Sequence, residues 1–409
     1  MKHSKKLILL VLKVLLPFAL AHLLSYLFRT VNAVVYPELS SELHLAANDI
    51  GLLTSSYLIM FAIAQLPIGV ALDHFGPRKV QVPMLLIAAS GAILFSFAHT
   101  LSELVVARGL IGLGVAASLM AAIKGTSLWF SHDRLPLVTA VLLSVGGIGA
   151  MLSTSPMHIA MDYVGWRNAF LGLGVATIMV SALIFFVVPE KDQNKQSTSF
   201  KQMAGMVKQL YSSWSFWKIS LYSIFANAAF MSVMGLWMGP WLKDVAHLNT
   251  TQASYALLMG AVAMFAGSLS FGWITNALQK QGFKPLLICG VGIWGFVIAQ
   301  LLMISNLEIP PFVIVIGFAF FGTAATMNYA IVAQSVPKHL TGRVSTSFNL
   351  LIFLIAFVLQ WAQGYIINLW QAVNGEYPEV AYQYAIGLTI LLQIPGLLLW
   401  FTLKPWEKA

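Results

Sequence analysis

The sequence predicts an all-α integral membrane protein with twelve transmembrane helices in two pseudo-symmetric six-helix bundles. Three observations support this fold class. Of the 409 residues, 59% are hydrophobic, only 9% are charged, and long apolar segments recur along the whole chain. A soluble domain carries about 25% charged residues. A chain with so few charges cannot cover its surface for water, so its solvent must be largely lipid.

The positions of the twelve helices follow from the thickness of a membrane. Crossing ~30 Å of hydrocarbon takes about 20 helical residues, because backbone amides in lipid must bond within their own segment. Windows of this length place the helices at 14–36, 50–72, 80–98, 103–127, 136–158, 167–188, 217–240, 252–276, 285–305, 310–333, 343–370 and 381–403. An even number of crossings leaves both termini on one side.

The basic residues of the connectors indicate which side that is. With a cytoplasmic N-terminus, 17 of the 23 lysines and arginines lie in cytoplasmic segments. This asymmetry is typical of bacterial cytoplasmic (inner) membrane proteins. We therefore expect cytoplasmic N- and C-termini. Because the basic residues are spread through short connectors, they indicate contact with anionic lipid headgroups rather than with nucleic acid.

The longest polar stretch divides the spans six and six. We expect an N-terminal bundle at 1–190, a cytoplasmic linker at 191–215 and a C-terminal bundle at 216–409. Within the linker, 200–211 has the pattern of an amphipathic helix lying on the membrane surface. Two six-helix bundles joined in this way are one architecture for rocking around a central site.

The connector after the second predicted helix carries a recognisable motif. It contains Gly69, Asp73, Gly76, Arg78 and Lys79 in the pattern G-x-x-x-D-x-x-G-x-R-K, and a degenerate second copy follows the eighth predicted helix at 272–284. This motif resembles the cytoplasmic signature of the major facilitator superfamily. Gly76 and its following proline are suited to a tight turn.

The resemblance implies a role for the five motif residues as a conformational latch. In the family, the aspartate faces the start of the eleventh helix, which here is 341–343. The positive end of that helix dipole would favour the carboxylate of Asp73. The alternative is that the connector is a plain solvated turn.

Two further segments resemble family patterns. Arg108 and Gly112 match the R-x-x-x-G pattern of the fourth helix, and a buried arginine must face protein or water rather than lipid. Arg108 has two possible roles: it takes part in the passage of protons or substrate, or it only forms a structural contact with another protein group. The fifth predicted helix, with Gly146, Gly149 and Pro156, matches the glycine-rich antiporter motif only in part, because the adjacent Gly-Pro pair is missing.

Arg29 is the most informative residue, since it lies near the middle of the first predicted helix. His22, Tyr26 and Arg29 follow helical steps of four and three, and the same face continues to Ala33 and Tyr36. Such a stripe is costly against lipid and natural along an aqueous cavity. We expect Arg29, with Tyr26 and His22, to bind an anionic group through the guanidinium fork. The alternative is that Arg29 pairs with a protein group.

Other polar residues within the spans are weaker candidates for solute binding. Lys124 is either a second cationic contact or a side chain that reaches the headgroups. The neutral candidates are each also suited to a hydrogen bond between helices, and they are Tyr57, Asn227, Asn328 and Gln360.

The resemblance implies proton symport, and the coupling candidates are His22 and Arg108. His22 is a candidate because imidazole titrates nearest physiological pH, and the alternative is a packed core histidine. All fourteen acidic residues fall in connectors or at helix ends. We expect no enzyme activity, no catalytic residues, no metal site and no cofactor, because phosphate-binding loops and metal-ligand clusters are missing from the sequence and the loops are short. The lone Cys289 indicates no redox chemistry.

These observations together predict a secondary active transporter. We expect a monomer that moves a small polar, anionic or zwitterionic organic solute across the cytoplasmic membrane by alternating access, in proton-coupled uptake. One alternative is a proton-driven exporter of drugs or siderophores with the same fold. Another, from a different class, is a non-transporting membrane receptor or scaffold.

Overall fold

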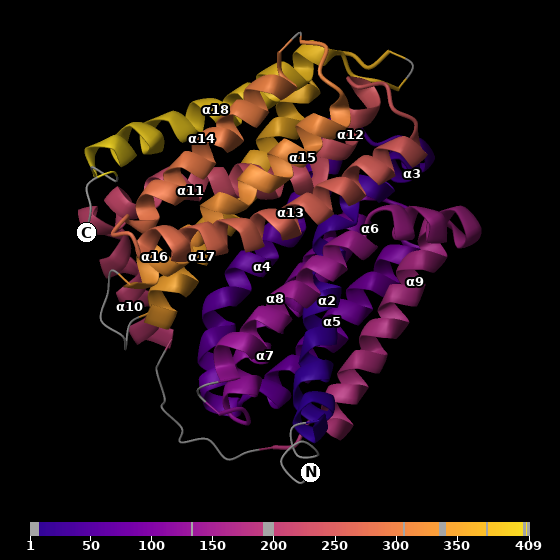
Figure 1. The fold of residues 1–409 in the computed structure, drawn as a ribbon. Coiled ribbons are helices and arrows are strands. Elements are labelled where there is room, and N and C mark those ends of the chain that lie inside the picture. Colours follow the sequence, from indigo (N-terminus) through magenta and orange to yellow (C-terminus); the bar gives the residue numbers. More distant parts are fainter. Residues whose placement is uncertain are drawn as a thin grey trace. The chain divides into compact units, whose positions relative to one another are not determined.

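The chain is helical through nearly all of its described length (Figure 1). This computed structural model describes the backbone of residues 8–131, 134–190, 200–305, 307–334, 341–373, 375–403 and 406. Within those ranges the β-type pairing is confined to an isolated bridge between Val373 and Glu376. A helical backbone satisfies its own amides, as a lipid environment requires.

Ten helices of the described chain are long and apolar enough to cross a membrane. Two shorter apolar helices, Leu137–Leu152 and Pro311–Met327, lie where the fifth and tenth spans are predicted. The ten long segments are Ile8–Thr30, Ala47–Phe75, Pro77–Phe97, Leu101–Ser127, Ser155–Val187, Trp214–Asp244, Thr250–Gln279, Pro285–Met303, Val344–Ile367 and Glu379–Thr402. The predicted fold class is confirmed.

The contacts divide the chain into two compact units. Unit 1 comprises Met1–Val31 and Ser56–Met203, and unit 2 comprises Asn32–Ser55 and Ala204–Ala409. Residues 32–55 therefore have their contacts with the second half of the chain. The predicted bundles at 1–190 and 216–409, with a linker between them, stay a prediction.

Unit 1 contains the helices of the first six predicted spans, except for the segment 32–55. These are η1 (Val11–Leu15), α2 (Leu16–Thr30), most of α4 (Ala47–Phe75), α5 (Pro77–Phe97), α6 (Leu101–Val115), α7 (Ser118–Ser127), α8 (Leu135–Leu152) and α9 (Ser155–Val187).

Unit 2 contains α3 (Asn32–Leu43), the start of α4 and the second half of the chain. Its further helices are α10 (Phe200–Tyr211), α11 (Trp214–Ser232), the π-helix η3 (Val233–Trp237), α12 (Met238–Asp244), α13 (Thr250–Gln279), α14 (Pro285–Met303), α15 (Pro311–Gly322), the 3-10 helix η4 (Thr323–Met327), α16 (Asn328–Gln334), α17 (Thr341–Ile367) and α18 (Glu379–Thr402). Helix α10 matches the predicted amphipathic segment.

The connectors at the two copies of the motif share a glycine of positive φ followed by a proline that begins a helix, directly after the glycine in the first copy and three residues later in the second. Gly76 has a φ of 86°, and Pro77 begins α5. In the second copy Gly282 has a φ of 88°, and Pro285 begins α14. Glycine adopts this positive φ without steric cost, and proline suits the first position of a helix because its missing N–H is not needed there.

Two predicted helix boundaries are wrong. The first span is interrupted at Val31, so Ala33 and Tyr36 belong to α3 of unit 2. The fifth predicted helix is interrupted after Leu152, and Pro156 lies in the first turn of α9, which is itself broken at Gly165, where φ is 76°. Polar residues do lie at both breaks, within 29–32 and at 153–155, but a window of about 20 residues averages them with the apolar residues around them.

Candidate functional site

In the last turn of α2, the guanidinium of Arg29 lies over two aromatic rings. The Cζ atom of Arg29 lies 4.7 Å from the ring centroid of Tyr26 on α2 and 5.1 Å from that of Phe61 on α4. Arg29 and Tyr26 are half-buried. Aromatic faces attract the guanidinium, and they orient it without consuming any of its N–H donors. The arrangement can present a planar cation to an anionic group.

His22 supports this arrangement from within unit 1. Its ring meets the Tyr26 ring edge-on, with centroids 5.1 Å apart and an interplanar angle of 79°. The side chain is only 2% exposed, and neither ring nitrogen has a hydrogen-bond partner among the described residues. A Cβ at Gly146 of α8 would lie 2.8 Å from the Nε2 atom of His22, so glycine makes room there. The predicted stripe is therefore a packed stack of His22, Tyr26 and Arg29.

Tyr57 packs beside the same turn. It is 1% exposed, and its hydroxyl donates to the carbonyl oxygen of Ser25 at 3.3 Å. Its ring stacks on Phe61, which in turn faces Arg29. The structure thus brings His22, Tyr26, Arg29 and Tyr57 into one neighbourhood of unit 1.

Asn227 and Asn328 bind helices of unit 2 to one another. The amide nitrogen of Asn227 donates to the carbonyl oxygens of Ser223 and Ala325, both at 2.9 Å. Asn328 donates to the carbonyl oxygen of Ile219 at 2.9 Å and accepts from the Tyr222 hydroxyl at 2.6 Å. Both residues serve as helix-to-helix contacts, and their predicted role in solute binding stays a prediction.

Gln360 differs from the two asparagines. It is 3% exposed, and its Nε2 donates to the carbonyl oxygen of Ser232 at 3.3 Å. Within the described part of the chain its Oε1 has no hydrogen-bond partner. It lies against η3, where the Trp237 indole donates to the Gln360 carbonyl oxygen at 3.1 Å. π-Helices occur frequently at functional sites. The Oε1 of Gln360 is therefore a hydrogen-bond acceptor beside a candidate functional position.

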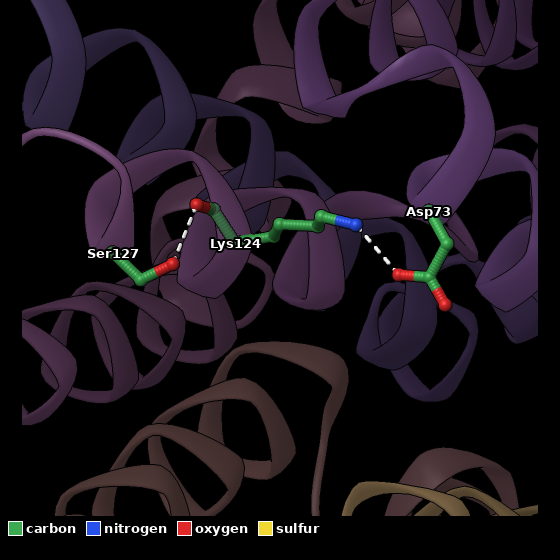
Figure 2. A network of polar contacts seen from close by, with 3 residues as sticks. All are labelled: Asp73, Lys124 and Ser127. Atoms are coloured by element: carbon green, nitrogen blue, oxygen red, sulfur yellow. Dashed lines mark hydrogen bonds and ion pairs between the residues drawn. The ribbon is translucent and has the colours of Figure 1, made fainter. Parts of the chain in front are cut away.

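The motif residues and Lys124 form ion pairs within unit 1. Figure 2 shows the Nζ of Lys124 on α7 directed at Asp73, with an N–O distance of 2.6 Å. Glu190 pairs with both Lys79 at 3.2 Å and Arg78 at 3.8 Å. These pairs are partly exposed and contribute at most about 1 kcal/mol each.

The predicted partner of Asp73, the segment 341–343, has side chains outside the described residues. The latch therefore stays a prediction. The structure adds that Lys124 already holds the Asp73 carboxylate, which accounts for a lysine near the end of an apolar helix without a contact to solute.

Asp244 is a buried acid that the sequence analysis did not single out. It is 4% exposed, and its Oδ2 accepts from the Tyr382 hydroxyl at 2.6 Å and from the Tyr377 backbone N–H at 3.2 Å. The Tyr377 hydroxyl accepts from the Ala47 N–H at the start of α4, at 3.0 Å. The sequence signal was a lone acid at the end of an apolar helix, which is also how an ordinary solvated helix end looks.

Within the described ranges, no group of three or more His, Cys, Asp or Glu side chains could hold a metal ion. What the structure offers is a polar interior inside helices that are apolar enough to cross a membrane. This combination is that of a multi-pass membrane protein.

Comparison with known proteins identifies the family. The model of the Major Facilitator Superfamily matches residues 18–360, and the chain belongs to this family of membrane transporters. A bacterial homologue of the human lysosomal transporter Spinster, solved in an inward-facing and occupied conformation, has the same fold, with a TM-score of 0.76 and 16% identity over 97% of this chain and 98% of that one.

Two curated relatives from Escherichia coli (strain K12) are similar along most of their length. A probable L-galactonate transporter is 25% identical over 372 residues, which is 85% of this chain and 81% of that protein. The probable galactarate/D-glucarate transporter GudP is 22% identical over 417 residues, or 93% of this chain and 92% of that protein. The predicted family and the prediction that the chain is not an enzyme are confirmed.

Proposed function

We propose that this chain is a secondary transporter that takes up a sugar acid or a similar small organic anion across the bacterial cytoplasmic membrane, with Arg29 as the anchor for the carboxylate. The observation that carries the proposal is the position of the Arg29 guanidinium on the rings of Tyr26 and Phe61 at the end of α2. An arginine fork suits a carboxylate because it can donate two parallel hydrogen bonds.

The relatives support the same class of solute. L-galactonate, galactarate and D-glucarate, which are named for the two relatives, all carry carboxylates on a polyhydroxylated chain. Tyr26, which lies beside Arg29 and is only half-buried, offers a hydroxyl and a ring surface to such a chain. The proposal includes alternating access by a monomer, contact with anionic lipid headgroups, and cytoplasmic N- and C-termini. The excess of basic residues in one set of connectors supports this orientation of the termini.

Binding of sugar acids to the purified protein tests the solute class. We expect L-galactonate, galactarate and D-glucarate to raise the thermal unfolding temperature, because a ligand at 100 times its Kd stabilises the folded state by about 2.7 kcal/mol. D-galactose, a neutral sugar of similar size, is the control and should have no effect. Equal stabilisation by galactose, or none by the three acids, contradicts the proposal.

We also propose that uptake is driven by protons through His22. Both ring nitrogens of His22 lack a hydrogen-bond partner among the described residues, and the ring is in contact with Tyr26 beside Arg29. Burial and the nearby Arg29 cation favour the neutral imidazole, so a proton would bind there together with a solute anion that offsets the charge of Arg29. A proton on this ring would sit in the same stack as the solute anchor.

Replacing His22 with glutamine separates proton coupling from solute movement. In proteoliposomes, His22→Gln should lose accumulation of the acid above its equilibrium level under an imposed pH gradient, and it should keep exchange of internal for external acid. His99→Gln, which changes an exposed histidine of the same unit, is the matched control. Full accumulation by His22→Gln would show that protons are carried elsewhere.

A further inference from the structure

The C-terminal part of α2, from Ser25 to Thr30, is held by side chains of α4 and α6 and by Ser153, which follows α8. The Tyr57 hydroxyl of α4 donates to the Ser25 carbonyl oxygen at 3.3 Å, and the NH1 of Arg108 on α6 donates to the Phe28 carbonyl oxygen at 3.1 Å. The Thr30 hydroxyl shares a hydrogen bond of 2.7 Å with the hydroxyl of Ser153, which follows α8. The turn that carries Arg29 is thus fixed from several directions.

Arg108 is the charged member of this set and is fully buried. Its Cζ atom lies 4.8 Å from the Phe95 ring centroid and 5.2 Å from that of Phe170, and its exposed fraction is 0%. Among the described residues, NH2 and Nε of Arg108 have no hydrogen-bond partner. The guanidinium is therefore stabilised by two ring faces and by a single carbonyl oxygen.

That carbonyl lies at a favourable place for a cation. Helix α2 ends at Thr30, so the Phe28 carbonyl belongs to its last turn, where carbonyls lack intrahelical donors and the helix dipole is negative. An arginine that donates there caps the helix and defines where it ends. A buried guanidinium is costly, and the cap accounts for its presence without any contact to solute.

The position of Arg29 depends directly on this cap. Arg29 follows Phe28, and successive residues of an α-helix point about 100° apart around the axis. Any rotation or fraying of the turn moves the guanidinium of Arg29 away from the Phe61 ring on α4, whereas the Tyr26 ring on α2 itself moves with it. The orientation of the anchor is therefore set by the hydrogen bond to the residue before it.

We propose that Arg108 is a positioning residue that caps the last turn of α2 and thereby holds Arg29 in the orientation that binds the carboxylate. The consequence for transport rests on the proposed function, whereas the cap itself does not. This role differs from the proton-coupling role predicted for Arg108, since it needs no change in protonation.

Another arginine of unit 1 provides a matched control. Arg167 of α9 also caps a helix end, because its NH1 donates to the carbonyl oxygens of Ser96 and Ala98 at the end of α5, at 3.1 and 2.7 Å. It too contacts a ring, with its Cζ atom 4.3 Å from the Trp166 centroid. Arg167→Met removes the same chemistry at a different helix.

Hydrogen exchange measured by mass spectrometry tests the cap without any ligand. Arg108→Met, which keeps length and loses the donor, should raise exchange of the amides of residues 28–31 by about tenfold or more, as loss of a charge-assisted hydrogen bond implies. Arg167→Met should leave these amides unchanged, and Arg108→Lys should be intermediate because it keeps a cation without the fork. Unchanged exchange in Arg108→Met overturns the proposal.

Affinity for L-galactonate tests the consequence. Arg108→Met should weaken binding about tenfold in the wild-type background and hardly at all in the Arg29→Lys background, because both changes act on one anchor. Equal weakening in both backgrounds means that Arg108 contacts the solute itself, and faster exchange with unchanged affinity means a purely structural cap. Either outcome overturns the positioning role.

The two proposals can fail separately. If L-galactonate, galactarate and D-glucarate all fail to bind the wild-type protein, the proposed function is wrong, and the exchange measurement still decides whether Arg108 caps the turn. If Arg108→Met does not fold, Arg108→Lys, which loses the fork, reports on the same turn, and normal exchange of the amides of residues 28–31 in Arg108→Lys overturns the cap.

Discussion

Arg29→Ala is expected to abolish both stabilisation and uptake by sugar acids. A hydrogen bond between charged groups contributes about 1.5–3 kcal/mol, which corresponds to roughly 10- to 150-fold in affinity, and a bidentate contact loses two at once. The measurement is thermal shift of the purified protein and uptake into proteoliposomes, at equal amounts of folded protein. The rings of Tyr26 and Phe61 remain in this variant, so a loss reports on the guanidinium rather than on the aromatic surroundings.

Arg29→Lys distinguishes the fork from the charge alone. Lysine keeps a positive charge but presents a point donor, so we expect partial recovery of affinity for the acids. If both variants bind and transport the acids normally, Arg29 is not the anchor. Acid that binds to the wild-type protein without crossing the bilayer would indicate a receptor, and net movement only outward from loaded vesicles would indicate an exporter.

The sequence predicted the helices well because hydropathy is a property of single segments. The segments found at Pro77–Phe97, Pro285–Met303 and Glu379–Thr402 lie within a few residues of their predicted places. The turn at Gly76 followed from local chemistry of the same kind. A boundary inside a mostly apolar stretch, such as the break at Val31, gives only a weak signal, because its few polar residues, Arg29, Thr30 and Asn32, are averaged with the apolar residues around them.

The sequence predicted only the part of the candidate site that lies on a single helix. The stack of His22, Tyr26 and Arg29 lies on consecutive turns of α2, so helical spacing was enough to find it. The pair of Lys124 with Asp73 joins residues far apart in the chain and depends on how two helices are rotated against each other. Hydropathy carries no information on that rotation.

The same limit explains Asp244. Its partners Tyr377 and Tyr382 are more than a hundred residues away, and a lone acid at the end of a helix looks like an ordinary solvated residue. Only the three-dimensional packing shows that the carboxylate is buried against two tyrosines. Side-chain pairs between distant helices are therefore the part of a membrane protein that a single sequence hides.

Gly114→Ala is expected to remove most of the folded protein. A Cβ at residue 114 of α6 would overlap the backbone nitrogen of Ala88 and lie 2.5 Å from the carbonyl oxygen of Met84, both on α5. These are backbone atoms, so no side chain can move aside and the two helices must separate. Overpacking of this kind costs typically 1–3 kcal/mol and more where backbones touch. The yield of monodisperse protein in size-exclusion chromatography measures the loss.

Gly172→Ala on α9 is the matched control, since a Cβ there meets no atom within 4 Å. It should fold with normal yield, and alanine in place of glycine favours a helix by up to about 1 kcal/mol. Glycine acts in opposite ways at the two positions: residue 114 allows two backbones to meet, as small residues do between membrane helices, whereas residue 172 only adds flexibility. Normal yield of Gly114→Ala would mean that the backbones of α5 and α6 are not in contact. The packing of α6, the helix that carries Arg108, would then differ from the one in this structure.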